Sequence, residues 1–247
     1  MSAKRNLSPM KTLSREYWQE AFRSFSDIRM LAVAAMIVAL RVVVKFLKVP
    51  LAEGLSLSFD CYVNSIGSLI YGPVVALAVG AVSDTLGCIL APTGPYFLPF
   101  ILVEMGSGFL FSLFLWRKVL SPERMLAAKF TVNLVCNIVL TSLFLKWEYY
   151  LFYGVEKAQA YNLINLTRIV KNLALFPLEG TLILLLIKGL CPPLISLKFL
   201  SPKCVGRLET NRIFWLEVGL LLLLSVLLVV FYPDWATFVK AHNLKLL

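Results

Sequence analysis

The sequence predicts an all-α, polytopic membrane protein, a bundle of six helices with a seventh transmembrane helix at the C-terminal end. Of its 247 residues, 59% are hydrophobic and only 15% are charged, and the mean hydropathy is +0.80. Soluble domains are about 45–50% apolar and about 25% charged, so this composition excludes a water-soluble globule. Apolar runs also recur along the chain at lengths near the roughly 20 residues that a helix needs to cross a bilayer.

Seven apolar runs, each bounded by charges or by Gly and Pro, are the expected helices. They lie at residues 29–47, 58–70, 73–90, 96–116, 127–148, 162–188 and 213–232. The second run is short, and Tyr71-Gly72-Pro73 separates it from the third, where Gly-Pro disfavours a continuous helix. We therefore expect two helices joined by a tight turn rather than one long helix.

The runs divide the chain into four regions. Residues 1–28 form an N-terminal segment with a short amphipathic stripe, which suits a helix lying at the inner leaflet. Residues 29–190 form a six-helix membrane domain. Residues 191–212 form a basic connection, and residues 213–247 hold the extra transmembrane helix and a short tail.

The basic residues set the expected orientation, because Lys and Arg are enriched in cytoplasmic loops. Fifteen of the 24 Lys and Arg residues fall in the N-terminal segment, the connection after the fourth run and the connection after the sixth. A cytoplasmic N-terminus places all three inside, so we expect a multi-pass membrane protein with that orientation. The connection after the fourth run holds Arg117, Lys118, Arg124 and Lys129.

Ionisable residues within the spans are the main functional signal. Each charge costs about 2.5–3.5 kcal/mol to insert and usually faces a cavity, a partner or water. In the expected orientation nearly all of them lie in the outer half of the bundle, which favours a polar pocket open to the outside. These residues are Arg41, Lys45, Asp60, Asp84, Glu104, Lys146, Glu148, Arg168 and Lys171.

Polar side chains also follow helical spacing on two of the runs. Asn165, Arg168 and Asn172 share a stripe on the sixth run, and Asn137 and Thr141 lie on one face of the fifth. Interhelical hydrogen bonds and a ligand pocket explain the Asn and Thr stripe equally well. For Arg168 we favour the pocket.

The charges indicate the kind of ligand. Arg168 and Lys171 suit an anionic ligand better than a cation. Asp84 and Glu104 would accept hydrogen bonds from a ligand amino group, and a structural ion pair with Arg41 or Lys45 is an equally good account of either.

Small residues spaced three or four apart form a second signal, because they let another helix approach closely. Ala32, Ala35 and Ala39 lie in the first run, and Gly72, Ala76 and Gly80 lie in the third. Internal packing and docking to a separate membrane subunit both explain this spacing.

Several function classes find no support in the sequence. The five cysteines show no metal-ligand spacing, so no metal or cofactor is expected. The basic residues punctuate apolar spans, which excludes the patch that nucleic-acid binding needs. The sequence contains no GxxxxGK[ST] motif, and its single histidine, His242, follows the last span. A membrane-embedded enzyme that uses Asp60, Asp84 or Glu104, or a stand-alone secondary transporter, remains an alternative.

Five motifs between residues 26 and 190 carry a family resemblance. They are Ser26–Leu31 with the Ala35/Ala39 pair, Tyr71-Gly72-Pro73 with Gly80 and Asp84, Pro92–Phe97 (Pro-Thr-Gly-Pro-Tyr-Phe), Leu140–Leu145, and Arg168 with Lys171. Together they resemble the substrate-binding (S) component of energy-coupling factor (ECF) vitamin transporters, and its folate family in particular. The chain departs from that family at Leu98–Ile101, at Thr141, where Asn is usual, and in its seventh helix.

The resemblance implies a transport subunit rather than an enzyme. It implies capture of a vitamin, folate or a reduced folate first among them, from the extracellular side. It also implies two kinds of partner. One is a transmembrane coupling protein, which would dock on Ala32, Ala35 and Ala39, and the other is a pair of ATPase subunits. Tyr96 and Phe97 are expected to cover or stack on the flat ring of the ligand. An S component for another small solute remains an alternative.

Overall fold

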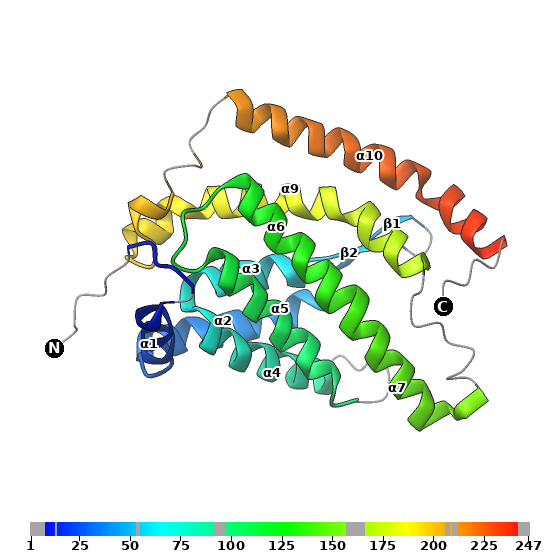
Figure 1. The fold of residues 1–247 in the computed structure, drawn as a ribbon, viewed down its shortest axis with the longest axis horizontal. Helices are drawn as coiled ribbons and strands as arrows, with labels where there is room; N and C mark the ends of the chain where they lie inside the picture. The colour runs from blue at the N-terminus through cyan, green and yellow to red at the C-terminus, as the bar shows by residue number, and fades with distance from the viewer. Residues whose placement is uncertain are drawn as a thin grey trace.

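Helices make up nearly all of the ordered elements in the described part of the chain (Figure 1). The computed structural model describes residues 8–12, 14–52, 55–90, 97–156, 166–205, 208 and 212–241. The predicted helical fold class is confirmed, with one small hairpin added. In chain order the elements are α1 (Arg15–Phe25), α2 (Ile28–Val44), β1 (Lys48–Ala52), β2 (Leu55–Ser58), α3 (Asp60–Tyr71), α4 (Pro73–Leu90), α5 (Phe100–Leu115), α6 (Pro122–Val132), the π-helix η1 (Asn133–Leu140), α7 (Thr141–Tyr153), α9 (Leu166–Ser196), the 3₁₀-helix η2 (Pro202–Cys204) and α10 (Arg212–Ala241).

Within the described residues, four helical segments are long and apolar enough to cross a membrane, whereas the sequence predicts seven spans. The second of them is continuous through α6, η1 and α7, and α5 is a shorter apolar helix beside them. The four are Pro73–Leu90, Pro122–Tyr153, Leu166–Ser196 and Phe214–Trp235.

The break between α3 and α4 falls where the Gly-Pro pair predicts it. Gly72 has a φ of +85°, a backbone conformation that glycine adopts without strain. A Cβ atom at this position would lie 2.7 Å from the ring of Trp116. Two constraints therefore require glycine at this position: the positive φ of the backbone, and the close approach of the Trp116 indole, which leaves no room for a Cβ atom.

A two-stranded antiparallel hairpin, absent from the sequence prediction, joins α2 to α3. Its register pairs Lys48 with Ser58 and Val49 with Leu57. In β2, Leu55 and Leu57 are buried and alternate with half-buried serines, the period-two pattern of a strand with one apolar face.

The N-terminal segment contains the amphipathic helix that the sequence predicts, α1. Its inner face is buried, with the Tyr17 ring edge-on to Trp116 at 4.8 Å between centroids. Phe22 and Phe25 on its other face are exposed. Helix α1 therefore packs on the bundle and leaves two aromatic rings available to a membrane surface.

Helices α4 and α5 form a close contact. A Cβ atom at Gly80 would come within 3 Å of backbone atoms of Met105 and Glu104. Ala76 is fully buried on the same stripe of α4, beside Gly108 of α5. The small-residue stripe of α4 therefore serves internal packing, which decides that alternative for this helix.

The last two long helices differ from their predicted limits. Helix α9 continues to Ser196, so it includes the first residues of the predicted 191–212 connection, and α10 extends beyond the predicted 213–232 in both directions. Helix α10 lies along α9 (Figure 1). Near its end, Tyr232 is buried with Leu55 of the hairpin and Leu175 of α9.

Candidate functional site

A buried ion cluster joins α2, α3 and α5. The Arg41 side chain is 0% exposed, and its Nε and Nη2 atoms donate to the two carboxylate oxygens of Asp60 at 2.9 and 2.7 Å. Nη2 also pairs with Glu104. A guanidinium donates to a carboxylate in this two-pronged way with high geometric specificity. The cluster fixes the rotation of three helices against one another.

A second ion pair lies one helical turn along α2. Lys45 Nζ is 3.5 Å from Asp84 Oδ1 of α4, and its side chain occupies the space beside Gly87. Asp84 and Glu104, both predicted as ligand contacts, therefore each face a cation of α2. Ion pairing accounts for their position in the bundle, and any contact with a ligand stays a prediction.

Polar side chains of η1 and α9 form a hydrogen-bonded ladder. Asn137 Nδ2 donates to Asn133 Oδ1 at 3.0 Å and to Asn172 Oδ1 at 3.4 Å. Asn172 in turn donates to the backbone carbonyl of Arg168 at 2.9 Å. The structure thus brings Asn137 and Asn172 together beside Arg168. Asn137 is a predicted ligand contact. Asn172 was recognised only as part of the polar stripe.

The π-helical turn at this point changes the stripe that an α-helical spacing predicts. Thr141 Oγ1 donates to the carbonyl of Cys136, five residues earlier, at 2.7 Å. This bond occupies the hydroxyl hydrogen of Thr141, so only its oxygen lone pairs are left for a ligand. Single π-turns within helices often lie at functional sites. The turn adjoins α5, where the Cys136 thiol faces Gly106.

The two cations at the start of α9 are half-buried. Within the described residues, Lys171 forms no hydrogen bond or ion pair, so its charge is available to an anion. The backbone carbonyl of Arg168 accepts the hydrogen bond from the Asn172 side chain. Both residues lie one to two turns from Leu175, which packs on the hairpin and α10.

An aromatic cluster lies before α5. Phe97 is buried, and its ring meets those of Phe100, Trp147 and Phe152 edge-on, with centroids 5.7, 5.5 and 6.2 Å away. Trp147 and Phe152 come from α7, so the cluster joins the start of α5 to the end of the long α6–α7 segment. The predicted contacts Tyr96 and Asn165 lie outside the described residues.

One ion pair corrects the sequence analysis. Lys129 was counted in a cytoplasmic connection, but it lies in α6, 2% exposed, with Nζ 2.7 Å from Glu179 Oε2 of α9. Its charge can lie in the bundle because a carboxylate neutralises it. The sequence signal was present in Glu179, an acidic residue within an apolar run.

The three alanines predicted to dock on a partner share an open face of α2. Ala32, Ala35 and Ala39 are exposed, and Met36 beside them is 71% exposed. The opposite face, with Ala34 and Ile37, is buried in the bundle. Among the described residues, the alanines of α2 therefore lie outside the packed core, unlike the small residues of α4.

Two folate transporters and a solved structure are among the proteins to which the chain is similar. It is 29% identical over 154 residues to the folate transporter FolT of Leuconostoc mesenteroides, covering 62% of this chain and 81% of that one. It is 27% identical over 119 residues to the folate transporter FolT of Clostridium novyi, covering 48% of this chain and 64% of that one. A crystal structure of FolT bound with folic acid superposes with a TM-score of 0.51 at 26% identity, covering 62% of this chain and 88% of the other.

A family model covers the whole region that holds the candidate site. Residues 29–192 match the model described as the substrate-specific component of the ECF transporter. The match takes in the ion cluster, the asparagine ladder and both cations of α9, and it ends before α10. This chain belongs to the ECF transporter substrate-specific component family.

Proposed function

We propose that this chain captures folate or a reduced folate for an ECF-type importer. The observation that carries the proposal is the similarity to two folate transporters and to a crystal structure of FolT bound with folic acid. The family match includes every described residue of the candidate site. We therefore expect the chain to act as the substrate-binding subunit of the importer, with folate as the first candidate substrate.

The chemistry of the site supports an anionic, ring-containing ligand. Folate carries carboxylates at one end and an amino-substituted ring at the other. Arg168 and Lys171 provide positive charge, which suits the carboxylates. Asn137 and Asn172 provide amide donors and acceptors beside them, and the Phe97 cluster provides aromatic surface for the ring.

Capture is proposed to occur from the extracellular side, with the N-terminus in the cytoplasm. The distribution of basic residues supports this orientation. Energy would come from two ATPase subunits through a membrane coupling protein, because the sequence contains no phosphate-binding loop of its own. The exposed alanine face of α2 is the proposed contact with the coupling protein, since small residues permit close helix approach.

Purified protein, without partner subunits, provides the test. Folate should raise its melting temperature, and Arg168→Ala should weaken binding by about 2–5 kcal/mol, the range for truncating one side of a buried charged contact. This variant keeps the backbone carbonyl that holds Asn172, so the ladder is undisturbed. Lys203→Ala, an exposed cation in η2, is the matched control.

Two results would contradict the proposal. Unchanged folate affinity in Arg168→Ala would remove that residue as the anchor. A parent chain that is stabilised by another vitamin, and not by folate, would leave an S component with a different substrate.

A further inference from the structure

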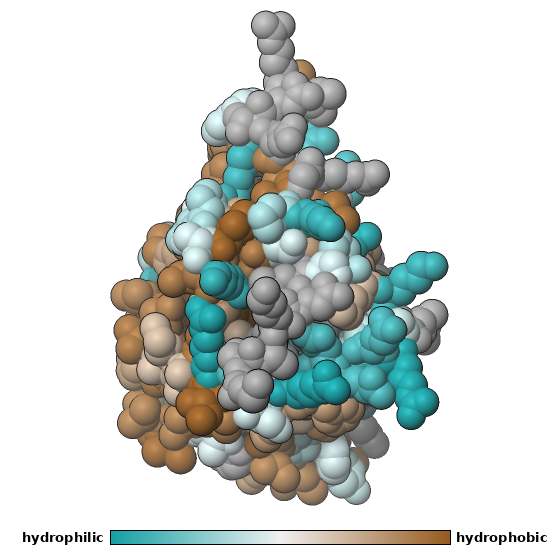
Figure 2. Space-filling model, turned by 90° about the vertical axis from the view of Figure 1, so that its left-hand side faces the viewer, coloured by the Kyte–Doolittle hydropathy of each residue, from teal (hydrophilic) through white to brown (hydrophobic). Residues whose placement is uncertain are grey.

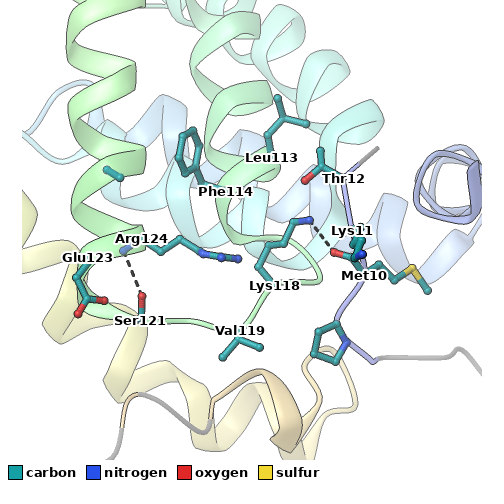
Figure 3. Close-up of a pocket in the computed structure, with 12 residues that line it drawn as sticks. Met10, Lys11, Thr12, Leu113, Phe114, Lys118, Val119, Ser121, Glu123 and Arg124 are labelled. Atoms are coloured by element: carbon teal, nitrogen blue, oxygen red, sulfur yellow. Dashed lines mark hydrogen bonds between the residues drawn. The ribbon is translucent and has the colours of Figure 1, made fainter. Parts of the chain in front are cut away.

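A pocket of about 850 Å³ opens at the end of the bundle on which α1 lies, away from the candidate folate site. Its walls come from three separate parts of the chain: the N-terminal segment 9–12, the last turn of α5 with the following connection, and the first turns of α6. Figure 3 shows Lys118 and Arg124 reaching into the space between these elements. This pocket takes no part in the function proposed above.

Positive charge dominates the polar part of this pocket. Lys11, Lys118 and Arg124 line it, against one carboxylate, Glu123. Lys118 is only 9% exposed, and its Nζ donates to the carbonyl of Met10 at 2.6 Å. Within the described residues neither Lys118 nor Arg124 forms an ion pair. Burial and the neighbouring Arg124 charge lower the pKa of Lys118, so an anion placed here would favour its charged form.

The start of α6 adds to this potential. Ser121 caps the helix by accepting from the backbone N–H of Arg124 at 3.3 Å, and Pro122 occupies its first turn. A helix N-terminus carries a partial positive charge and favours anions such as phosphate. Lys118 and Arg124, which form no ion pair with a described residue, and the helix end therefore favour the same ligand group, an anion such as phosphate.

The rest of the pocket is apolar. Leu113, Phe114, Val119 and Ala127 line it beside the cations. Helix α1, next to it, exposes Phe22 (64%) and Phe25 (46%), as a helix at a membrane surface does. Figure 2, which views this end of the molecule, shows hydrophilic side chains on one side and apolar side chains on the other. A soluble anion would contact only the cations, whereas an anion with an acyl chain would also contact this apolar wall.

We propose that this pocket binds an anionic phospholipid. Its phosphate would lie at Lys118 and Arg124, and the part of an acyl chain nearest the headgroup would lie against Phe114 and Leu113. Basic pockets between transmembrane helices bind anionic lipid headgroups in this way. Because Lys118 also holds the N-terminal segment through Met10, bound lipid would fasten that segment and α1 to the bundle.

Native mass spectrometry of the purified full chain tests the proposal, with phosphatidylglycerol and phosphatidylcholine titrated separately. One phosphatidylglycerol should bind more tightly than phosphatidylcholine. Arg124→Gln should weaken phosphatidylglycerol binding about fivefold, since a basic residue near an anionic lipid contributes about that factor. The Arg124 side chain makes no hydrogen bond within the described residues, so this variant should fold normally, and its melting temperature checks that it does.

Two further variants sharpen the result. Lys118→Met combined with Arg124→Gln should reduce phosphatidylglycerol binding about 30-fold, while Lys203→Met, outside the pocket, should leave it unchanged. Equal affinity for the two lipids, or an unaltered double variant, would overturn the proposal. Displacement of phosphatidylglycerol by an equal concentration of inorganic phosphate would overturn the lipid assignment in favour of a free-phosphate site.

Discussion

Gly80→Ala tests the close contact that sets the distance between α4 and α5. The new Cβ atom would lie 2.7 Å from Met105 Cα, 2.8 Å from Met105 N and 2.9 Å from the Glu104 carbonyl carbon. All three are backbone atoms that cannot rotate away, so the two helices must separate. Overpacking of a well-packed core costs about 1–3 kcal/mol, and a contact to backbone places this site near the top of that range.

Gly189→Ala is the matched control, because nothing lies within 4 Å of a Cβ at that position of α9. Both variants gain about 1 kcal/mol of helix propensity, so the difference between them isolates the steric cost. The assay is thermal unfolding of the purified chain in detergent, where each kcal/mol corresponds to about 2–4 °C for a chain of this size. Equal melting temperatures for the two variants would refute the packing argument.

Three further changes probe the exposed alanine face of α2, the ion pair of Lys129 with Glu179, and the last helix. Ala35→Trp should abolish folate uptake by cells while folate binding by the isolated chain persists, because it blocks only the exposed face of α2; loss of binding as well would place that face inside the fold. Lys129→Met should destabilise the chain by about 3–5 kcal/mol, as removal of one partner of a buried ion pair does. The double variant Lys129→Met with Glu179→Leu should regain most of the lost stability. A double variant as unstable as the single one would contradict the assigned ion pair. Asn243→Cys, in a variant without the five native cysteines, should be labelled from outside intact cells, and labelling only after lysis would contradict the predicted topology.

Much of the fold follows from composition and local pattern. The apolar runs predict the long helices because a bilayer requires apolar segments of fixed length. The Gly72-Pro73 pair predicts the break between α3 and α4 from backbone stereochemistry alone. The hairpin was missed because Leu55 and Leu57 form too short an alternation to stand out between two apolar runs.

The candidate site is less predictable because its geometry depends on contacts distant in sequence. Arg41, Asp60 and Glu104 are recognisable as charges within spans, but their pairing depends on how α2, α3 and α5 rotate against one another. Lys129 was misplaced for the same reason, since its partner Glu179 lies on a helix that follows much later. The π-turn of η1 has no clear sequence signal, and it alters which residues face α9.

Folate binding by the chain alone tests the central claim most directly. Calorimetric titration of the purified full-length protein, with no coupling protein or ATPase subunit present, should give one folate bound per chain without turnover. A reduced folate should compete for the same site. A folded, thermally cooperative protein that takes up no folate in this titration would contradict the account.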